Sequence, residues 1–157
     1  MPGSNARLRP GQFWAIPLST GRFASGAVLG VARREDGRIL APSNRAFLAG
    51  LLDWEGEGPP TADSIAGARV VAQGIAHIKT ITETGGEIIG AATAPIAPLT
   101  WRSAPGPAGD GWVYAGVERI RPALPADRGL GIILGIGYGY LRELAEGRGR
   151  RAARHSG

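Results

Sequence analysis

The stretch from Phe13 to Leu29 constrains most strongly how this chain can fold. Two apolar runs of β-favouring residues flank the polar residues 19–22, which include Gly21. Glycine supplies the backbone freedom that a tight turn between antiparallel strands needs. The pattern therefore predicts a β-hairpin. Pro17 removes a backbone donor from the first strand, so that strand is expected at a sheet edge or with a bulge there.

The rest of the chain predicts more strands and two short helices. Thr61 is a helix-capping residue type and predicts a helix to about Gly67, while Gly147 should end a second helix at 139–146. Residues 45–53 suit either a helical turn or a strand. The Ala-, Pro- and Gly-rich residues 91–111 are expected to be a long surface connection. Further strands are expected at 23–32, 39–41, 70–82, 112–120 and 132–134.

These elements predict a single α+β domain. Its core is expected to be a mainly antiparallel, twisted or partly closed β-sheet, with one short internal helix and a C-terminal helix. A chain of 157 residues has the usual size of one domain. We expect an N-terminal lead-in at residues 1–10, the domain at 11–147 and a basic disordered tail at 148–157.

The net charge of +5 raises the question of nucleic-acid binding. Four arginines lie beyond Gly147, and without them the net charge is only +1. The other basic residues alternate with acidic ones along the chain, so we expect a solvated tail and no nucleic-acid partner. The N-terminus has no apolar stretch like that of a signal sequence, and no apolar run reaches the ~18 residues that span a bilayer. A cytoplasmic protein without membrane contact is expected.

His77 and Lys79 are the first candidate site residues. His77 is the only histidine in the predicted domain, because His155 lies in the tail, and Lys79 is the only lysine among 17 arginines. On one strand the two side chains would share a face. This pair could form a general base, an anion site or a partner contact; His77 could equally be a partly buried structural histidine.

A second candidate site is an acidic cluster around a tryptophan. Asp53, Trp54, Glu55 and Glu57 precede two prolines. A tryptophan at a loop edge can anchor an interface, with the carboxylates facing a basic partner. In the alternative interpretation, Trp54 closes the end of the sheet and the acids are solvated.

The sequence assigns no metal, no cofactor and no definite catalytic residue. Cysteine is absent, which excludes disulfides, thiolate metal sites and cysteine nucleophiles. Neither the HxH nor the HExxH spacing of metal ligands occurs, and no serine lies in a GxSxG turn. The glycine series at 129–139 matches no phosphate-binding pattern.

Several sequence blocks resemble the immunity protein twenty-six family. They are the opening FWAIPL hairpin, residues 51–56, 59–61, 74–81 and 85–90, and less closely 112–121 and 137–140. The resemblance covers roughly residues 10–146 and favours a strand at 50–54. It implies a bacterial immunity protein of a polymorphic toxin system, which binds and neutralises a cognate toxin in the cytoplasm. The partner contacts would come from the acidic cluster and from His77 and Lys79.

The same family name also covers a small phosphotriesterase. This alternative implies a hydrolase that acts on organophosphates. His77 would then be the base or ligand, Lys79 would polarise the phosphoryl oxygen, and Asp53 would orient the histidine.

Overall fold

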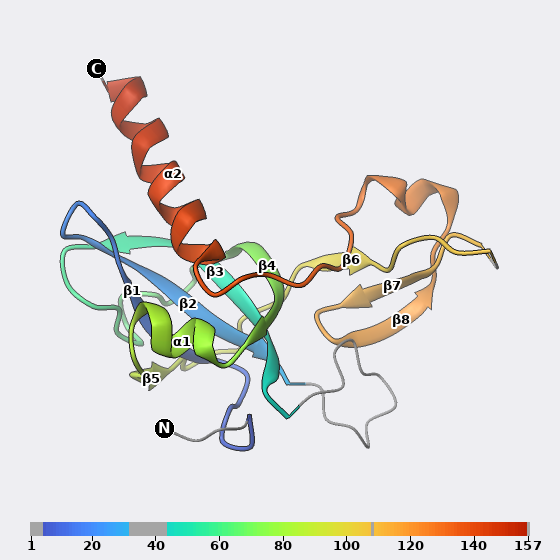
Figure 1. Ribbon diagram of the computed structural model, residues 1–157, viewed down its shortest axis with the longest axis horizontal. Helices are drawn as coiled ribbons and strands as arrows, with labels where there is room; N and C mark the ends of the chain where they lie inside the picture. The colour runs from blue at the N-terminus through green and yellow to red at the C-terminus, as the bar shows by residue number, and fades with distance from the viewer. Residues whose placement is uncertain (1–4, 32–43, 108, 157) are drawn as a thin grey trace.

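The computed structural model describes residues 5–31, 44–107 and 109–156, with side chains up to residue 148. It confirms the predicted α+β class, with two antiparallel sheets of order β4-β3-β2-β1-β5 and β6-β7-β8 (Figure 1). The larger sheet consists of β1 (Gln12–Pro17), β2 (Phe23–Gly30), β3 (Ala46–Gly56), β4 (Val70–His77) and β5 (Gly90–Ala91). The smaller consists of β6 (Thr100–Arg102), β7 (Trp112–Ala115) and β8 (Glu118–Pro122). The helices are α1 (Lys79–Thr84), the 3-10 helix η2 (Pro125–Gly129) and α2 (Tyr140–Ser156).

Strands β1 and β2 form the predicted hairpin. The Leu18 N–H donates to the Arg22 carbonyl at 2.9 Å and closes the turn. Gly21 has a φ of 85°, a left-handed conformation that other residues rarely adopt, so glycine is needed there. Strand β5 pairs only with the first two residues of β1. Pro17, at the far end of β1, therefore lies beyond this pairing, in agreement with the predicted edge position.

Both faces of the larger sheet are buried. Every residue of β2 from Ala24 to Gly30 is buried, and successive side chains of a strand point to opposite faces. One face packs beneath α1 and the start of α2, and α1 lies in front of this sheet in Figure 1. Its core includes Trp14, Ile16, Val28, Leu51, Ile81 and Leu141. The opposite core includes Phe13, Ala27, Leu29, Leu48, Leu52 and Trp101.

Trp14 fixes α1 on the sheet. Its fully buried ring lies against Gly26 of β2, where a Cβ would collide with the ring. Its Nε1–H donates to Oγ1 of Thr84, the last residue of α1, at 3.0 Å. Gly85 then lies against the Ala15 carbonyl so closely that a side chain there has no room. Two glycines therefore allow the helix and the tryptophan to pack tightly on the strands.

The smaller sheet lies beside the larger one in Figure 1. The Gln73 side chain connects the two, because it donates to the Leu99 carbonyl at 3.0 Å and accepts from the Leu99 N–H at 2.8 Å. Within the smaller unit, the Asp127 carboxylate of η2 accepts two hydrogen bonds from Arg121 of β8. These bonds and one from the Leu124 N–H lower the pKa of Asp127 to about 2.

The predicted strand at 70–82 is wrong in its second half. Strand β4 ends at His77, and α1 begins at Lys79. The helix buries Thr80, Ile81 and Thr84, a spacing that places all three on one helical face against the sheet. Packing against Trp14 thus overrides the β-propensity of this run.

Four further predictions also differ from the structure. Residues 61–67 form turns in place of a helix, although Thr61 and Ser64 exchange the expected cap hydrogen bonds at 3.0 and 2.8 Å. Residues 112–120 form the β7–β8 hairpin, since Gly116 has a φ of 60° and turns the chain. Residues 132–134 make only isolated bridges, and the connection at 91–111 includes β6.

The remaining predictions concern β3, the end of α2, residues 39–41 and the domain boundaries. Residues 46–53 belong to β3, which confirms the strand expected at 50–54 and extends it. The helix end expected at Gly147 is wrong, because the backbone of α2 is helical to Ser156, through most of the segment predicted as a disordered tail. The strand expected at 39–41 lies outside the described residues. The domain boundaries stay predictions.

We expect Gly26→Ala to destabilise the fold by about 1–3 kcal/mol, because the new methyl group overpacks against Trp14. Gly58→Ala is the matched control, since no atom lies within 4 Å of a Cβ there, and its effect should stay within about 0.5 kcal/mol. Urea unfolding of both variants measures this difference. Equal stability of the two variants would show that Trp14 does not need the space at Gly26.

Candidate functional site

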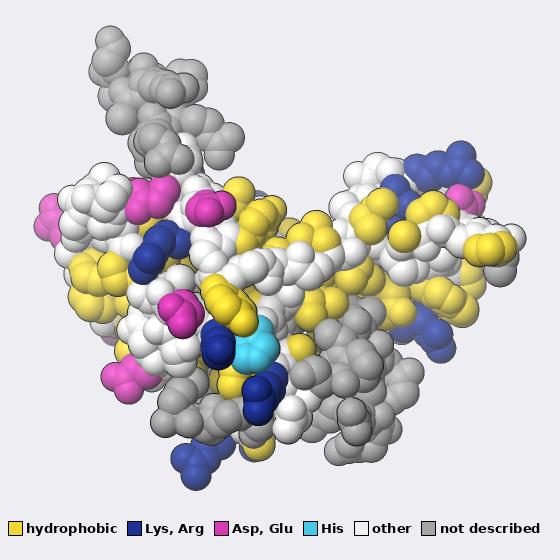
Figure 2. Space-filling view, viewed as in Figure 1, with side chains coloured by type: hydrophobic (Ala, Val, Ile, Leu, Met, Phe, Trp, Pro, Cys, Tyr) yellow, Lys and Arg dark blue, Asp and Glu magenta, His cyan; other side chains and the backbone are white. Residues whose placement is uncertain are grey.

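A basic–aromatic patch lies where β4 ends and α1 begins. We define it by His77, the last residue of β4, Lys79, the first residue of α1, and Arg45 and Tyr138. Arg45 directly precedes β3, and Tyr138 lies two residues before α2. Figure 2 shows the histidine, in cyan, beside basic side chains on the surface. The ends of four elements of the fold thus meet at this patch.

Short contacts fix the histidine ring. The backbone N–H of Lys79 donates to Nδ1 of His77 at 3.1 Å, so the proton of the neutral ring is placed on Nε2. The ring packs edge-on against Tyr138 with 5.7 Å between centroids. The Lys79 ammonium lies 5.9 Å from the centroid of the same Tyr138 ring, within reach of a weak cation–π contact.

Two positively charged side chains lie close to His77. Partial burial lowers the pKa of His77 below its usual value, and the charges of Lys79 and Arg45 lower it further. Both charges repel a proton on the imidazole. His77 is therefore mainly neutral near pH 7 and sits beside two permanent cations.

Sequence analysis identified His77 and Lys79 but missed Arg45 and Tyr138. The sequence analysis expected His77 and Lys79 to share one face of a strand, and this is also wrong. The two residues flank the junction between a strand and a helix. Arg45 reaches the patch because its carbonyl accepts the Ile78 N–H at 2.8 Å. Tyr138 belongs to a segment about 60 residues later in the chain. These are long-range contacts, for which the sequence has no local signal.

The acidic cluster lies on β3 and just beyond its end. Arg22 forms ion pairs with Glu55 at 3.6 Å and with Glu57 at 3.9 Å. Asp53 pairs with Arg148 of α2 at 3.7 Å, and the same guanidinium donates to two β3 carbonyls. The half-buried Trp54 packs against the second core and over Gly56. The carboxylates of this cluster therefore already have cationic partners within the chain.

The structure separates the two predicted groups of site residues. Strands β3 and β4 are antiparallel neighbours, with Ala46 opposite His77 and Leu52 opposite Val70. Asp53 lies seven residues along β3 from Ala46, which is about 23 Å of strand. The interpretation in which Asp53 orients His77 is therefore wrong.

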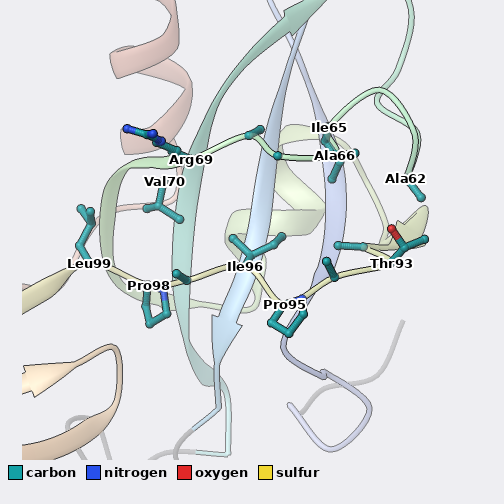
Figure 3. A pocket seen from close by; sticks show the side chains of 15 residues that line it. Ala62, Ile65, Ala66, Arg69, Val70, Thr93, Pro95, Ile96, Pro98 and Leu99 are labelled. Carbon is teal, nitrogen blue, oxygen red and sulfur yellow. The ribbon is translucent and has the colours of Figure 1, made fainter.

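An apolar groove opens on the other side of the sheet from α1. Two loops, residues 62–70 and 92–99, enclose a space of about 490 Å³ (Figure 3). Ile65, Val70, Ile96 and Leu99 line it, and Arg69 is the single ionisable residue of its lining. The groove brings no acid–base pair together.

In the described part of the chain, no three His, Asp or Glu side chains lie close enough together to hold a metal ion. None of the described helices is long and apolar enough to cross a membrane. Comparison of the chain with protein-family models, with curated proteins and with solved structures finds no match. The resemblance to an immunity protein family therefore stays a prediction.

We expect the imidazole of His77 to titrate below pH 6.5 in the folded protein, as measured by NMR. Since the unfolded chain then binds the proton more tightly, folding stability should fall as the pH drops below about 6.5. Lys79→Ala removes one repulsive charge and should raise the pKa toward its usual value. Arg69→Ala removes the same charge at the other end of β4 and should leave the pKa of His77 unchanged. A His77 pKa at or above 6.5 in the native chain would contradict this electrostatic account.

Proposed function

We propose that this chain is an immunity protein that binds and neutralises a cognate bacterial toxin in the cytoplasm, and that the basic–aromatic patch contacts the toxin. The observation that carries the proposal is the arrangement of His77, Lys79 and Tyr138 on a surface fixed by the sheet and α1. Tyrosine is enriched at protein interfaces, where it often contributes much of the binding energy. Tyr138 exposes 43% of its surface and is therefore accessible.

The rigidity of the patch supports a binding role. The Lys79 backbone fixes the His77 ring, and α1 is bound to the sheet through Thr84 and Trp14. A surface that is ordered before binding loses little conformational entropy when a partner docks. Such a surface suits recognition of a protein.

The acidic cluster is the weaker candidate for the main contact. Its carboxylates pair with Arg22 and Arg148, so a basic partner would have to displace these arginines. We therefore place Asp53, Trp54, Glu55 and Glu57 outside the centre of the proposed interface. Trp54 is also half-buried and packs against the core, which limits its contact with a partner.

The alternative function, a hydrolase of phosphotriesters, has less support from the geometry. His77 and Lys79 lie together, as this reaction would require, but Nδ1 of His77 is bound to a backbone N–H. Asp53, the third residue of that hypothesis, lies along β3 far from the ring. A chromogenic triester assay on the native chain and on His77→Ala tests this function directly.

Co-expression with the toxin of any toxin gene found next to this one tests the proposed function. We expect the native chain to restore growth of a bacterial host and to co-elute with the toxin. Lys79→Glu should weaken the complex by about tenfold or more, because it places a like charge opposite the toxin surface that Lys79 contacts. Arg69→Glu makes the same charge change away from the patch and should keep full protection. Unchanged protection by Lys79→Glu would remove the patch from the interface.

A further inference from the structure

The apolar groove between residues 62–70 and 92–99 has the size and lining of a small-molecule site. Its volume of about 490 Å³ lies within the range of ligand pockets in proteins, roughly 300–1,000 Å³. Alanines and a glycine form much of its lining and leave the space open, while Ile65, Val70, Ile96 and Leu99 give it larger apolar walls. Such a lining suits the apolar part of a ligand.

Both walls of the groove are held in place within the chain. The first wall is joined to β3, because the Arg69 carbonyl accepts the Asp53 N–H at 2.7 Å. In the second wall, the Gln73 side chain holds Leu99 through two hydrogen bonds, and Ile96 packs against the second core. A site that is formed before binding loses little conformational entropy when a ligand enters.

Arg69 carries the single charge among the described residues that line the groove. It lies at the end near Val70 and Leu99, and its exposed side chain extends outward from the rim (Figure 3). In the described part of the chain Arg69 forms no ion pair, and the nearby Asp53 carboxylate pairs with Arg148. A guanidinium can hold a carboxylate through two parallel hydrogen bonds. The rim therefore complements an anionic end of a ligand whose apolar part fills the groove.

We propose that the groove binds a free small molecule with an apolar chain and one terminal carboxylate, the chain lying between the two loops and the carboxylate on Arg69. This site is separate from the proposed toxin contact. The groove lies at the Val70 end of β4, whereas the basic–aromatic patch lies at the His77 end. Ligand binding in the groove therefore leaves the surface proposed for the toxin uncovered.

A small carboxylate fits this groove better than a peptide or a nucleotide does. A peptide brings backbone N–H and C=O groups that need partners where water is excluded. The polar side chains of the lining are only Arg69 and Thr93, and Pro95 and Pro98 each remove a backbone donor from the second wall. A nucleotide brings several negative charges to a single cation. An alkyl chain with one carboxylate leaves none of these groups unpaired.

The test uses decanoate as the ligand and decanol as its uncharged counterpart, each below the concentration at which it aggregates. Isothermal titration of the full chain at about pH 7, where the carboxylate is ionised, gives both dissociation constants. We expect decanoate to bind about threefold to tenfold more tightly, because the arginine stabilises its charge at an exposed position. Amide NMR shifts on binding should concentrate at residues 65–70 and 93–99.

Two variants separate the charge from the space. Arg69→Gln should bind decanoate no more tightly than decanol, whereas Arg7→Gln removes the same charge outside the groove and should match the native chain. Ala66→Trp should weaken both ligands by at least about tenfold, because its ring occupies the volume that the alkyl chain needs. Ala66, Arg69 and Arg7 are exposed, so none of these changes disturbs the core.

No binding of decanoate, or an unchanged affinity of Arg69→Gln for it, would overturn this inference. Tighter binding of decyltrimethylammonium, a cation with the same chain, would overturn the assigned charge. Tighter binding of a capped apolar pentapeptide would assign the groove to a protein segment. Retention on phosphatidylglycerol vesicles without binding of free decanoate would assign it to a membrane surface.

Discussion

The packing of Trp14 on Gly26 is the contact on which the rest of this structure depends. The absence of a side chain at Gly26 lets the indole lie flat on β2, and the indole N–H then holds Thr84 at the end of α1. An aromatic ring of this size buries a large apolar area, so its position determines where the helix can lie. Because α1 begins at Lys79, the same contact sets the geometry of the basic–aromatic patch.

Because β3 and β4 are antiparallel, the acidic cluster and the basic–aromatic patch lie at opposite ends of these two strands. At one end, Arg22, directly before β2, and Arg148 of α2 form ion pairs with the carboxylates that follow Leu52. At the other end, Arg45, His77 and Lys79 meet beside an aromatic ring, where partial burial and then the two neighbouring positive charges lower the pKa of the histidine. The carboxylates at the first end have cationic partners within the chain, and at the second end the exposed Lys79 lies beside the exposed Tyr138, which is why our proposed function places partner binding at the second.

The sequence predicts the parts of this fold that local pattern controls. The hairpin around Gly21 follows from turn chemistry and is confirmed, whereas the local pattern at 45–53 left helix and strand open and only the family resemblance favoured the strand at 50–54 that the structure has. The change from strand to helix after His77 could not be predicted, because Trp14, more than 60 residues earlier, packs on that segment. His77 and Lys79 could be singled out from the sequence because each is rare in its composition. Arg45 and Tyr138 could not, because they reach the patch only through tertiary contacts.

Hydrogen–deuterium exchange of the free chain and of its complex with the toxin tests the central claim most directly. We predict slower exchange in the complex at residues 77–81 and 137–139, which surround the basic–aromatic patch. The amide of Lys79, which bonds Nδ1 of His77, should be among the protected groups. Protection confined to residues 53–57, with the patch unchanged, would contradict the account and place the toxin on the acidic cluster.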